Sequence, residues 1–393
     1  ALAVVATVPV VQLLSLGYLL EASGRVARSG RLRDGIFGVR QAARVGSLVL
    51  GTWLMILLLQ VVSEFWYSSH LIDPAGEVTR RWRFALVALT ALMVLHLVSA
   101  WYCGARLRHF FWPVLAVVLL PWWLFRRLVG RILIPRADGG SGRRPFAVRL
   151  LRDLLLPPPL QDWFVPAIVF RGLRRGGLYQ HSRDAVWNFV LALRVRYFFG
   201  LGLRGALGAA IWLVVPILIF IAATQLPPGP GVLAGLFGGL LFFLVLLYLP
   251  FLQALFAAEN RWGALFQVGE VRRLFQRTPL AFGLALLVTL LFALPLYLLK
   301  IELTPREIAF LPSIFFVAFI LPARLLTGWA VGRARRREGR SFFLWRWLVR
   351  LAEVPAVAFF VFVVFFTRYT SWYGVWSLFE QHAFLIPVPF LGM

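Results

Sequence analysis

The sequence predicts an all-α integral membrane protein with about eight transmembrane helices. Three observations predict this class: 61% of the residues are hydrophobic, the mean hydropathy is +0.81, and basic residues gather between long apolar runs. A helix needs about 20 mostly apolar residues to cross the hydrocarbon core of a bilayer. Eight stretches meet or approach this length: Ala1–Leu20, Gly46–Trp66, Phe84–Cys103, Gly205–Thr224, Val232–Ala257, Leu280–Leu299, Ile308–Val331 and Val354–Thr367.

The basic residues predict the orientation of these spans. Of 41 basic residues all but Lys300 are Arg, and 33 of them lie in four alternate gaps between spans: 21–46, 104–203, 258–278 and 332–350. The other gaps hold only six basic residues. Because basic loops stay cytoplasmic, we expect a multi-pass protein of a bacterial inner membrane. Both ends of the chain are then extracytoplasmic.

The net charge of +25 bears on the partners of the chain. In a soluble protein it would indicate nucleic acid. Here the charge lies beside apolar spans, so we expect anionic lipid head groups of the cytoplasmic leaflet as the counter-charge, and no nucleic acid. The predicted lipid contacts are Arg272, Arg273, Arg333, Arg335, Arg336 and Arg337. The single cysteine, Cys103, excludes an intrachain disulfide and a Cys-based zinc or iron–sulfur site.

The start of the sequence bears on what precedes the first predicted span and on whether that span is a signal peptide. The sequence begins Ala-Leu-Ala without Met, so we expect residues before Ala1. Ala1–Leu20 lacks a basic n-region, which favours a span over a signal peptide.

Four segments follow from this pattern. They are a three-span unit at 1–103, a cytoplasmic or interfacial amphipathic region at 104–203, a five-span bundle at 204–367, and an extracytoplasmic aromatic tail at 368–393. Within the second segment, 110–134 is expected to be re-entrant or to lie in the membrane plane. Its apolar run is short, contains Pro113 and Pro121, and has Arg on both sides. A complete crossing there would reverse the side of every later loop.

One arrangement recurs along the chain: a span, an Arg-bearing amphipathic connector of about 20 residues, and another span. It occurs around 21–46, 258–278 and 332–350. The recurrence indicates an internal duplication. The alternative is that any multi-span protein needs basic connectors.

Two runs carry a resemblance to a known family. Gly17-Tyr18-Leu19-Leu20 precedes a basic, Gly-containing connector, and the run 256–266 leads through its connector to Thr278-Pro279 before a span. These units resemble a family of prokaryotic multi-span proteins catalogued as a domain of unknown function (number four thousand and thirteen). The resemblance covers about half of the chain, without 126–163. It implies an integral-membrane fold and brings no activity.

Ionisable residues inside spans are the best functional pointers, because burying them costs free energy unless they are paired or hydrated. His96 is in the middle of the third span; it could serve a proton relay or ligate a haem, or it could be a neutral imidazole bonded to a neighbouring helix. Arg324 follows Pro322 in the seventh span. We expect it to pair with Glu259 or Glu353 as a clamp between helices, with a substrate-anion site as the alternative.

Prolines and glycines mark the packing of the spans. Broken helices build many transporter sites, whereas simple kinks are also common in membrane helices. The candidate kinks are Pro216, Pro250, Pro295 and Pro322. Gly235 and Gly239 have the spacing that allows two helices to approach closely, which favours packing over a pore.

The C-terminal tail is aromatic but too interrupted for a span. It is expected either to anchor at the head-group level or to dock on a partner subunit. The residues proposed for docking are Trp372, Trp376, Phe384 and Phe390.

The sequence thus favours a non-catalytic membrane scaffold or an accessory subunit of a larger inner-membrane complex. We find no acid–base pair, metal-ligand motif or nucleotide loop, and expect no cofactor. A transporter or channel-like protein using the Pro-containing helices is the alternative. A lipid-modifying membrane enzyme is a third hypothesis, and no acid–base pair or metal motif supports it.

Overall fold

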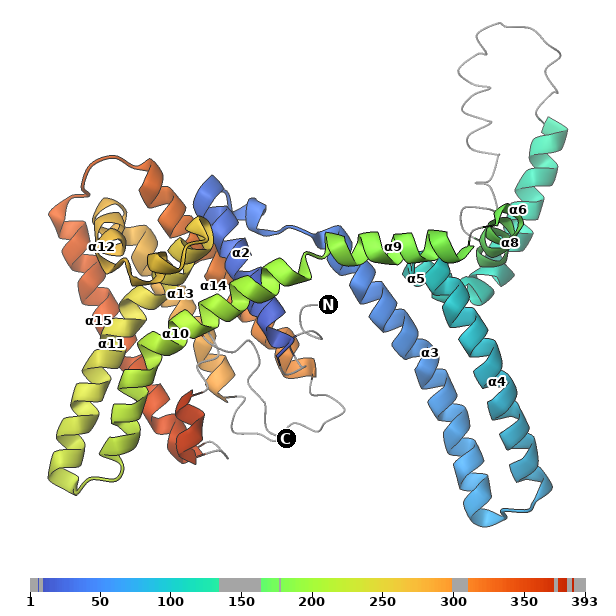
Figure 1. Cartoon of the computed structure of the whole chain (residues 1–393), viewed down its shortest axis with the longest axis horizontal. Helices are drawn as coiled ribbons and strands as arrows, with labels where there is room; N and C mark the ends of the chain where they lie inside the picture. Colours follow the sequence, from blue (N-terminus) through green and yellow to red (C-terminus); the bar gives the residue numbers. More distant parts are fainter. Residues whose placement is uncertain are drawn as a thin grey trace, which may run out of the picture. The chain divides into compact units, whose positions relative to one another are not determined.

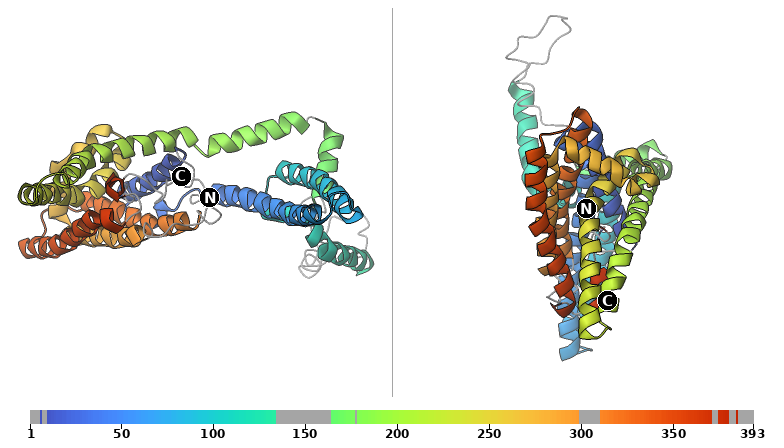
Figure 2. Two further views of the ribbon diagram at one scale, coloured as in Figure 1. Left: turned by 90° about the horizontal axis from the view of Figure 1, so that it is seen from below. Right: turned by 90° about the vertical axis from the view of Figure 1, so that its left-hand side faces the viewer.

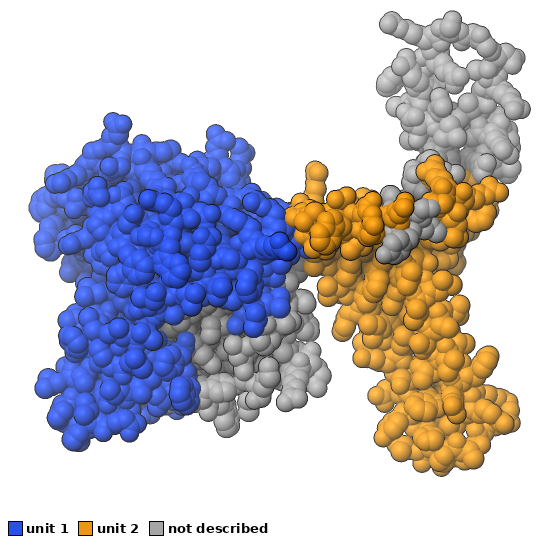
Figure 3. All heavy atoms as spheres, viewed as in Figure 1, with its two compact units in different colours: residues 1–39, 193–393 blue, residues 40–192 orange. Residues whose placement is uncertain are grey.

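A computed structural model describes residues 6, 10–133, 164–176, 178–298, 310–370, 374–379 and 384. The described residues form helices and turns, with no strand among them. The chain divides into two compact units (Figure 3): unit 1 contains residues 1–39 and 193–393, and unit 2 contains residues 40–192. These boundaries differ from the four predicted segments, because the N-terminal helix packs with the C-terminal bundle.

Unit 1 is a helical bundle (Figure 1). Its described elements are α2 (Gln12–Ser29), η1 (Leu32–Gly35), α10 (Val195–Ala223), α11 (Pro228–Glu259), η3 (Trp262–Phe266), α12 (Val268–Arg277), α13 (Pro279–Leu298), α14 (Phe310–Arg336), α15 (Phe343–Thr370) and η5 (Gly374–Phe379). Figure 2 shows α10 beside α11 and α13 beside α14 and α15.

Unit 2 holds the remaining described helices (Figure 1). They are α3 (Val39–Ile72), α4 (Glu77–Tyr102), α5 (Leu107–Phe110), α6 (Trp112–Leu133), α8 (Val165–Arg175) and α9 (Leu178–Ala192). A turn at residues 73–76 joins α3 to α4, and Thr79 Oγ1 donates a hydrogen bond to the Asp73 carbonyl at 2.7 Å. The buried core of this unit is small: Ala100, Ala105 and Phe110.

The helices confirm an all-α membrane fold. Seven stretches of described helix are long and apolar enough to cross a bilayer: Val39–Ile72, Glu77–Tyr102, Ser182–Ala223, Pro228–Glu259, Pro279–Leu296, Ile314–Arg336 and Phe343–Thr367. The first predicted span corresponds to α2, which continues nine residues past the predicted end at Leu20. That extension carries Glu21, Arg25 and Arg28, so α2 is a more polar helix than the other seven.

Helix α2 lies against α10, α11 and α14, and glycines bring the backbones together. A Cβ on Gly24 would lie 2.5 Å from the Ala257 carbonyl oxygen of α11. A Cβ on Gly328 of α14 would lie 2.2 Å from the Ser23 carbonyl oxygen. These distances leave no room for any side chain, and such small residues are how membrane helices make close van der Waals contact. Twelve of the 18 residues of α2 are buried as a result.

Two connectors of unit 1 follow the same backbone path. Both α2 and α11 end at a left-handed residue, Gly30 (φ 70°) and Asn260 (φ 52°), whose N–H bonds the carbonyl four residues before it. Glycine and asparagine are the residues that favour this conformation. An extended Arg follows in each case, Arg31 or Arg261, and then a short 3-10 helix. The shared path supports the predicted internal duplication.

Two sequence predictions for the middle of the chain need adjustment. The sequence predicts the boundary between the amphipathic region and the five-span bundle at residues 203–204, with a span beginning at Gly205. Instead α9 ends at Ala192, Arg194 takes φ 50°, and α10 begins at Val195. The predicted re-entrant or in-plane segment forms one helix, α6, which continues through Pro121. It therefore is not a hairpin of two arms; an in-plane position remains a prediction.

Candidate functional site

A buried polar chain crosses the core of unit 1 near Arg324. The guanidinium of Arg324 donates from Nη1 to Gln253 Oε1, and the Gln253 amide donates from Nε2 to the Phe384 carbonyl at 3.0 Å. Arg324 is 4% exposed and Gln253 is fully buried. The arrangement links α14, α11 and the C-terminal segment. It gives each buried polar group a partner, which a charge at this depth requires.

The predicted pairing of Arg324 with Glu259 or Glu353 is wrong. Glu259 ends α11 and binds two other guanidinium groups, those of Arg261 and Arg335, each at 2.6 Å. Glu353 makes no ion pair within 4.0 Å in the described part of the chain. The neutral amide of Gln253, six residues before Glu259 in α11, accepts from Arg324 where we expected a carboxylate.

Glu21, whose carboxylate is buried, was not identified in the sequence analysis. It is 4% exposed. Its Oε1 accepts from Arg25 at 2.9 Å and Arg28 at 3.0 Å, and its Oε2 accepts from the Tyr197 hydroxyl at 2.7 Å. The signal available was the i, i+4 spacing of Glu21 and Arg25 beside a third charge, which indicates a helical ion-pair cluster rather than the start of a loop.

Arg28 also satisfies the end of a neighbouring helix. Its Nη1 donates to the carbonyl oxygens of Ala257 and Ala258 at 3.0 and 3.1 Å, at the C-terminus of α11. A helix end leaves such carbonyls unpaired and carries a partial negative charge, so a cation there is stabilising. Arg335 bonds Glu259, and Arg336 lies beside Gly30. Residues of three Arg-rich connectors therefore meet at one end of unit 1.

Glu353 lines two small cavities. One, of about 240 Å³, lies between α11, α12, α13 and α15, and Arg272 and Arg350 also line it. The other, of about 260 Å³, lies between α13 and α15 and is otherwise lined by apolar residues and Gly283. A Cβ on Gly283 would lie 2.6 Å from Val349 Cγ1 and 3.6 Å from Glu353 Oε1, so the glycine permits the close approach of Val349, and the carboxylate lies at an ordinary van der Waals distance.

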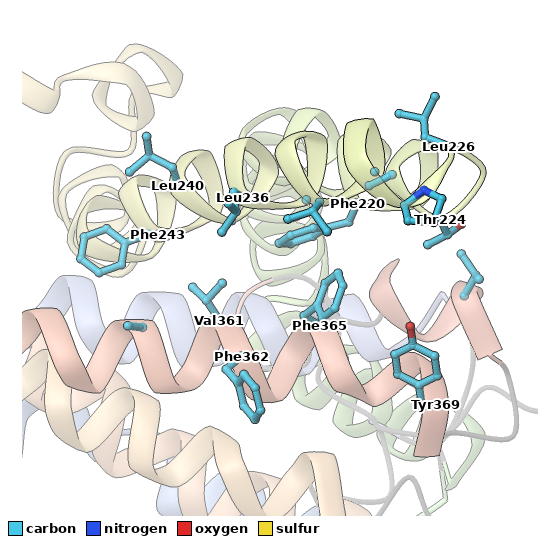
Figure 4. Close-up of a pocket in the computed structure, with 18 of the residues that line it drawn as sticks. Phe220, Thr224, Leu226, Leu236, Leu240, Phe243, Val361, Phe362, Phe365 and Tyr369 are labelled. Atoms are coloured by element: carbon cyan, nitrogen blue, oxygen red, sulfur yellow. The ribbon is translucent and has the colours of Figure 1, made fainter.

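A larger cavity is an apolar groove of about 1000 Å³ (Figure 4). It lies between α10 and α11 on one side and α15 and η5 on the other. Val361 and Phe365 extend from α15 toward Phe220 and Leu236. Thr224 and Tyr369, near one end, supply its polar side chains.

Two of the glycines that line the α11 side of this groove, Gly235 and Gly239, have no close contact with other described residues. A Cβ on Gly235 would meet its nearest neighbour at 4.0 Å, and a Cβ on Gly239 would meet Val361 at 3.7 Å. Both are ordinary van der Waals distances. Gly238, on another face of α11, is different, because a Cβ there would lie 2.9 Å from Ile219. Gly235 and Gly239 therefore leave space that the described residues do not fill.

His96 belongs to unit 2 and bonds a neighbouring helix. Its Nε2 lies 2.7 Å from the Phe110 carbonyl oxygen of α5, and its ring lies 6.2 Å from that of Trp112. This is the arrangement of the neutral-imidazole hypothesis. In the described residues no group of three or more His, Cys, Asp or Glu could hold a metal ion.

His109 is a second histidine of unit 2 and lies outside the candidate spans. Its Nε2 accepts from Arg108 Nε at 3.4 Å, which assigns the proton to Nδ1, and Nδ1 has no hydrogen-bond partner. Burial, with smaller contributions from Arg108 and Arg106, lowers the pKa of His109 to about 4.

We expect unit 2 to lose stability as pH falls from 7 toward 4. An unfolded His has a pKa of about 6.5, so the unfolded chain binds the proton first and folding becomes less favourable through this interval. His109→Phe is expected to reduce the loss. Unfolding midpoints at pH 7 and pH 5, followed by tryptophan fluorescence, measure it. An equal acid loss in both proteins would contradict the assignment.

The four prolines lie inside continuous helices. Pro216 is in α10, Pro250 in α11, Pro295 in α13 and Pro322 in α14, and each helix runs on past its proline. These helices do not present the unwound half-helix ends on which the transporter alternative depends.

The predicted lipid-contact arginines are exposed at the ends of α12 and α14, and several have protein partners. Arg273 pairs with Glu270 at 3.1 Å, and Arg333 lies over the Trp329 ring at 5.4 Å. Arg272 lines the smaller cavity beside Glu353. Arg337 is exposed.

The residues proposed for docking in the aromatic tail differ in burial. Phe384 is 1% exposed and packs into the core of unit 1, so its predicted role in docking a partner is wrong. Trp376, in η5, is 74% exposed and stays a candidate. Trp372 and Phe390 lie outside the described residues.

Comparison with known proteins gives no relative. No family model, curated protein or solved structure matches this chain. The architecture and the geometry of the sites therefore carry the functional inference.

Proposed function

We propose that this chain is a non-catalytic integral-membrane scaffold or accessory subunit of a larger assembly in a bacterial inner membrane. The observation that carries the proposal is the groove between α11 and α15. Two of its glycines, Gly235 and Gly239, are one turn apart, and a Cβ on either would meet nothing closer than 3.7 Å among the described residues. Small residues at this spacing allow a second transmembrane helix to approach closely. The proposed occupant is a transmembrane helix of a partner subunit.

Unit 2 adds support for the same role. The apolar windows of α3 and α4 are only 6% and 11% buried, against 50% for α13. Lipid or other subunits must cover this surface. The hairpin of α3 and α4 has a small core of its own and contributes little to folding stability. This supports a role of the hairpin in association with other subunits.

The proposal includes the orientation expected from charge. We propose eight spans with α2 as the first, Arg-rich connectors in the cytoplasm and in contact with anionic lipid, and both ends extracytoplasmic. The meeting of Arg28 with Ala257, and of Arg335 with Glu259, supports this, because three basic connectors then share one side. The resemblance to the multi-span family of unknown function is part of the same proposal.

Photo-cross-linking in native membranes tests the docking groove. A photoreactive amino acid at Val361, which faces the groove, is expected to give a protein adduct that mass spectrometry identifies. Gly235→Leu with Gly239→Leu is expected to reduce this adduct about tenfold or more by filling the space, the effect of losing about 1.4 kcal/mol of association free energy.

A matched control and a folding measurement accompany that experiment. Phe237→Leu changes an exposed residue of α11 outside the groove and should leave the adduct intact. The thermal unfolding midpoint of the double Leu variant should stay within a few degrees of the wild type. Adducts with lipid alone, or adducts unchanged by the two Leu substitutions, would count against a partner helix.

A further inference from the structure

The cavity beside Glu353 is lined by charged groups of opposite sign that form no ion pair with one another within 4.0 Å. Arg272 enters it from α12, Arg350 and Glu353 from α15, and Tyr248 from α11. Glu353 is one turn after Arg350 on the same helix. In the described residues Glu353 makes no hydrogen bond and no ion pair within 4.0 Å, and the same holds for Arg272.

Arg350 is held by its ring contact rather than by the carboxylate. Its Cζ lies 5.5 Å from the centroid of the Phe275 ring, a cation–π arrangement that orients the guanidinium while leaving its N–H groups available. Two guanidinium groups and one carboxylate thus face a space of about 240 Å³. Arg272 and Arg350 are exposed and Glu353 is partly buried, so these charged groups are accessible to a ligand from outside the bundle.

An apolar space continues from the carboxylate. The neighbouring cavity of about 260 Å³ shares Glu353 and extends along α13 and α15, lined by Leu284, Leu287, Leu290 and Ala356 among others. Gly283 lies where the two cavities approach Glu353. The combined shape has a charged compartment and an adjoining compartment suited to hydrocarbon.

We propose that this pair of cavities binds a phosphoethanolamine-type zwitterion, with an aminophospholipid as the full ligand. The phosphate would meet Arg272 and Arg350, because guanidinium N–H groups match phosphate oxygens. The primary ammonium would meet Glu353, and one acyl chain would lie between α13 and α15. The site serves lipid selection and does not rest on the proposed docking groove.

Native mass spectrometry of the purified full chain tests the site. The probes are phosphatidylethanolamine and phosphatidylglycerol with identical acyl chains, offered in equal amounts. The wild type is expected to retain the former about tenfold better, since only it brings an ammonium to Glu353. Glu353→Gln should abolish the preference while still binding phosphatidylglycerol. Arg272→Gln with Arg350→Gln should weaken both lipids.

Controls separate this site from general surface binding. Arg81→Gln removes an exposed arginine that pairs with Glu77 on α4 and lines neither cavity, and it should change neither affinity. Displacement by soluble O-phosphoethanolamine would identify the free compound as a source of the ligand, whereas its failure to compete would identify the lipid; either supports the shared chemistry. Equal binding of the two lipids by the wild type, or an unchanged preference in folded Glu353→Gln, would overturn the proposal.

Discussion

Gly328→Leu is expected to prevent unit 1 from folding. The position has no room even for a methyl group, because a Cβ would lie 2.2 Å from the carbonyl oxygen of Ser23, a backbone atom of a buried helix. Overpacking a well-packed core costs about 1–3 kcal/mol, and a clash with backbone on a second helix belongs at or above the upper end. Size-exclusion chromatography of the fluorescently tagged protein in mild detergent should show aggregated material.

Gly239→Leu is the matched control for that experiment. It places the same side chain on another helix of the same unit, where a Cβ meets nothing closer than 3.7 Å. This variant should elute as a single species with a normal unfolding midpoint. A monodisperse Gly328→Leu protein with the wild-type midpoint would show that α2 and α14 do not approach as closely as described.

Gln253→Leu should destabilise unit 1 by about 3 kcal/mol. The substitution removes the Oε1 acceptor of a buried Arg324 and the Nε2 donor to the Phe384 carbonyl. Removing one partner from a buried charge typically costs about 3–5 kcal/mol, because the remaining charge stays desolvated. Thermal unfolding in detergent, monitored by tryptophan fluorescence, measures the change.

A double-mutant cycle isolates the interaction between these two residues. Arg324→Leu combined with Gln253→Leu is expected to lose less stability than the sum of the two single variants, because the bond between these residues can be lost only once. Gln253→Asn tests the length of the side chain, since its shorter amide cannot join the same two partners. Strict additivity of the two Leu substitutions would contradict a direct bond.

The membrane fold was predictable because apolar runs and Arg-rich gaps report directly on burial in lipid. Their alternation predicted α10, α11, α13, α14 and α15. For most ends of these helices, the predicted residue lies within several residues of the observed one. The end of α2 was not predictable in this way. Glu21, Arg25 and Arg28 look like a cytoplasmic connector by composition, yet Tyr197 and the carbonyls of α11 satisfy them inside the bundle.

The polar sites illustrate the same limit. Sequence identifies Arg324 as an intramembrane charge, and it cannot tell which helix supplies the acceptor. We expected a carboxylate because opposite charges attract, whereas the acceptor bonded to Arg324 Nη1 is the neutral amide of Gln253. Likewise Gly235 and Gly328 are equivalent in sequence. Only the distances around them distinguish a glycine used within the chain from one that leaves space.

The position of α2 has a consequence for how the protein is made. Ser23 lies 3.5 Å, oxygen to oxygen, from Thr327, a residue 304 positions later in the chain. The ribosome therefore releases α2 long before its neighbours exist, and at that moment Glu21 and its polar companions face lipid or water. Synthesis halted before α14 should leave the first helix loosely inserted and open to degradation. Assembly of unit 1 is completed from its two ends, after residues 40–192 have been synthesised in between.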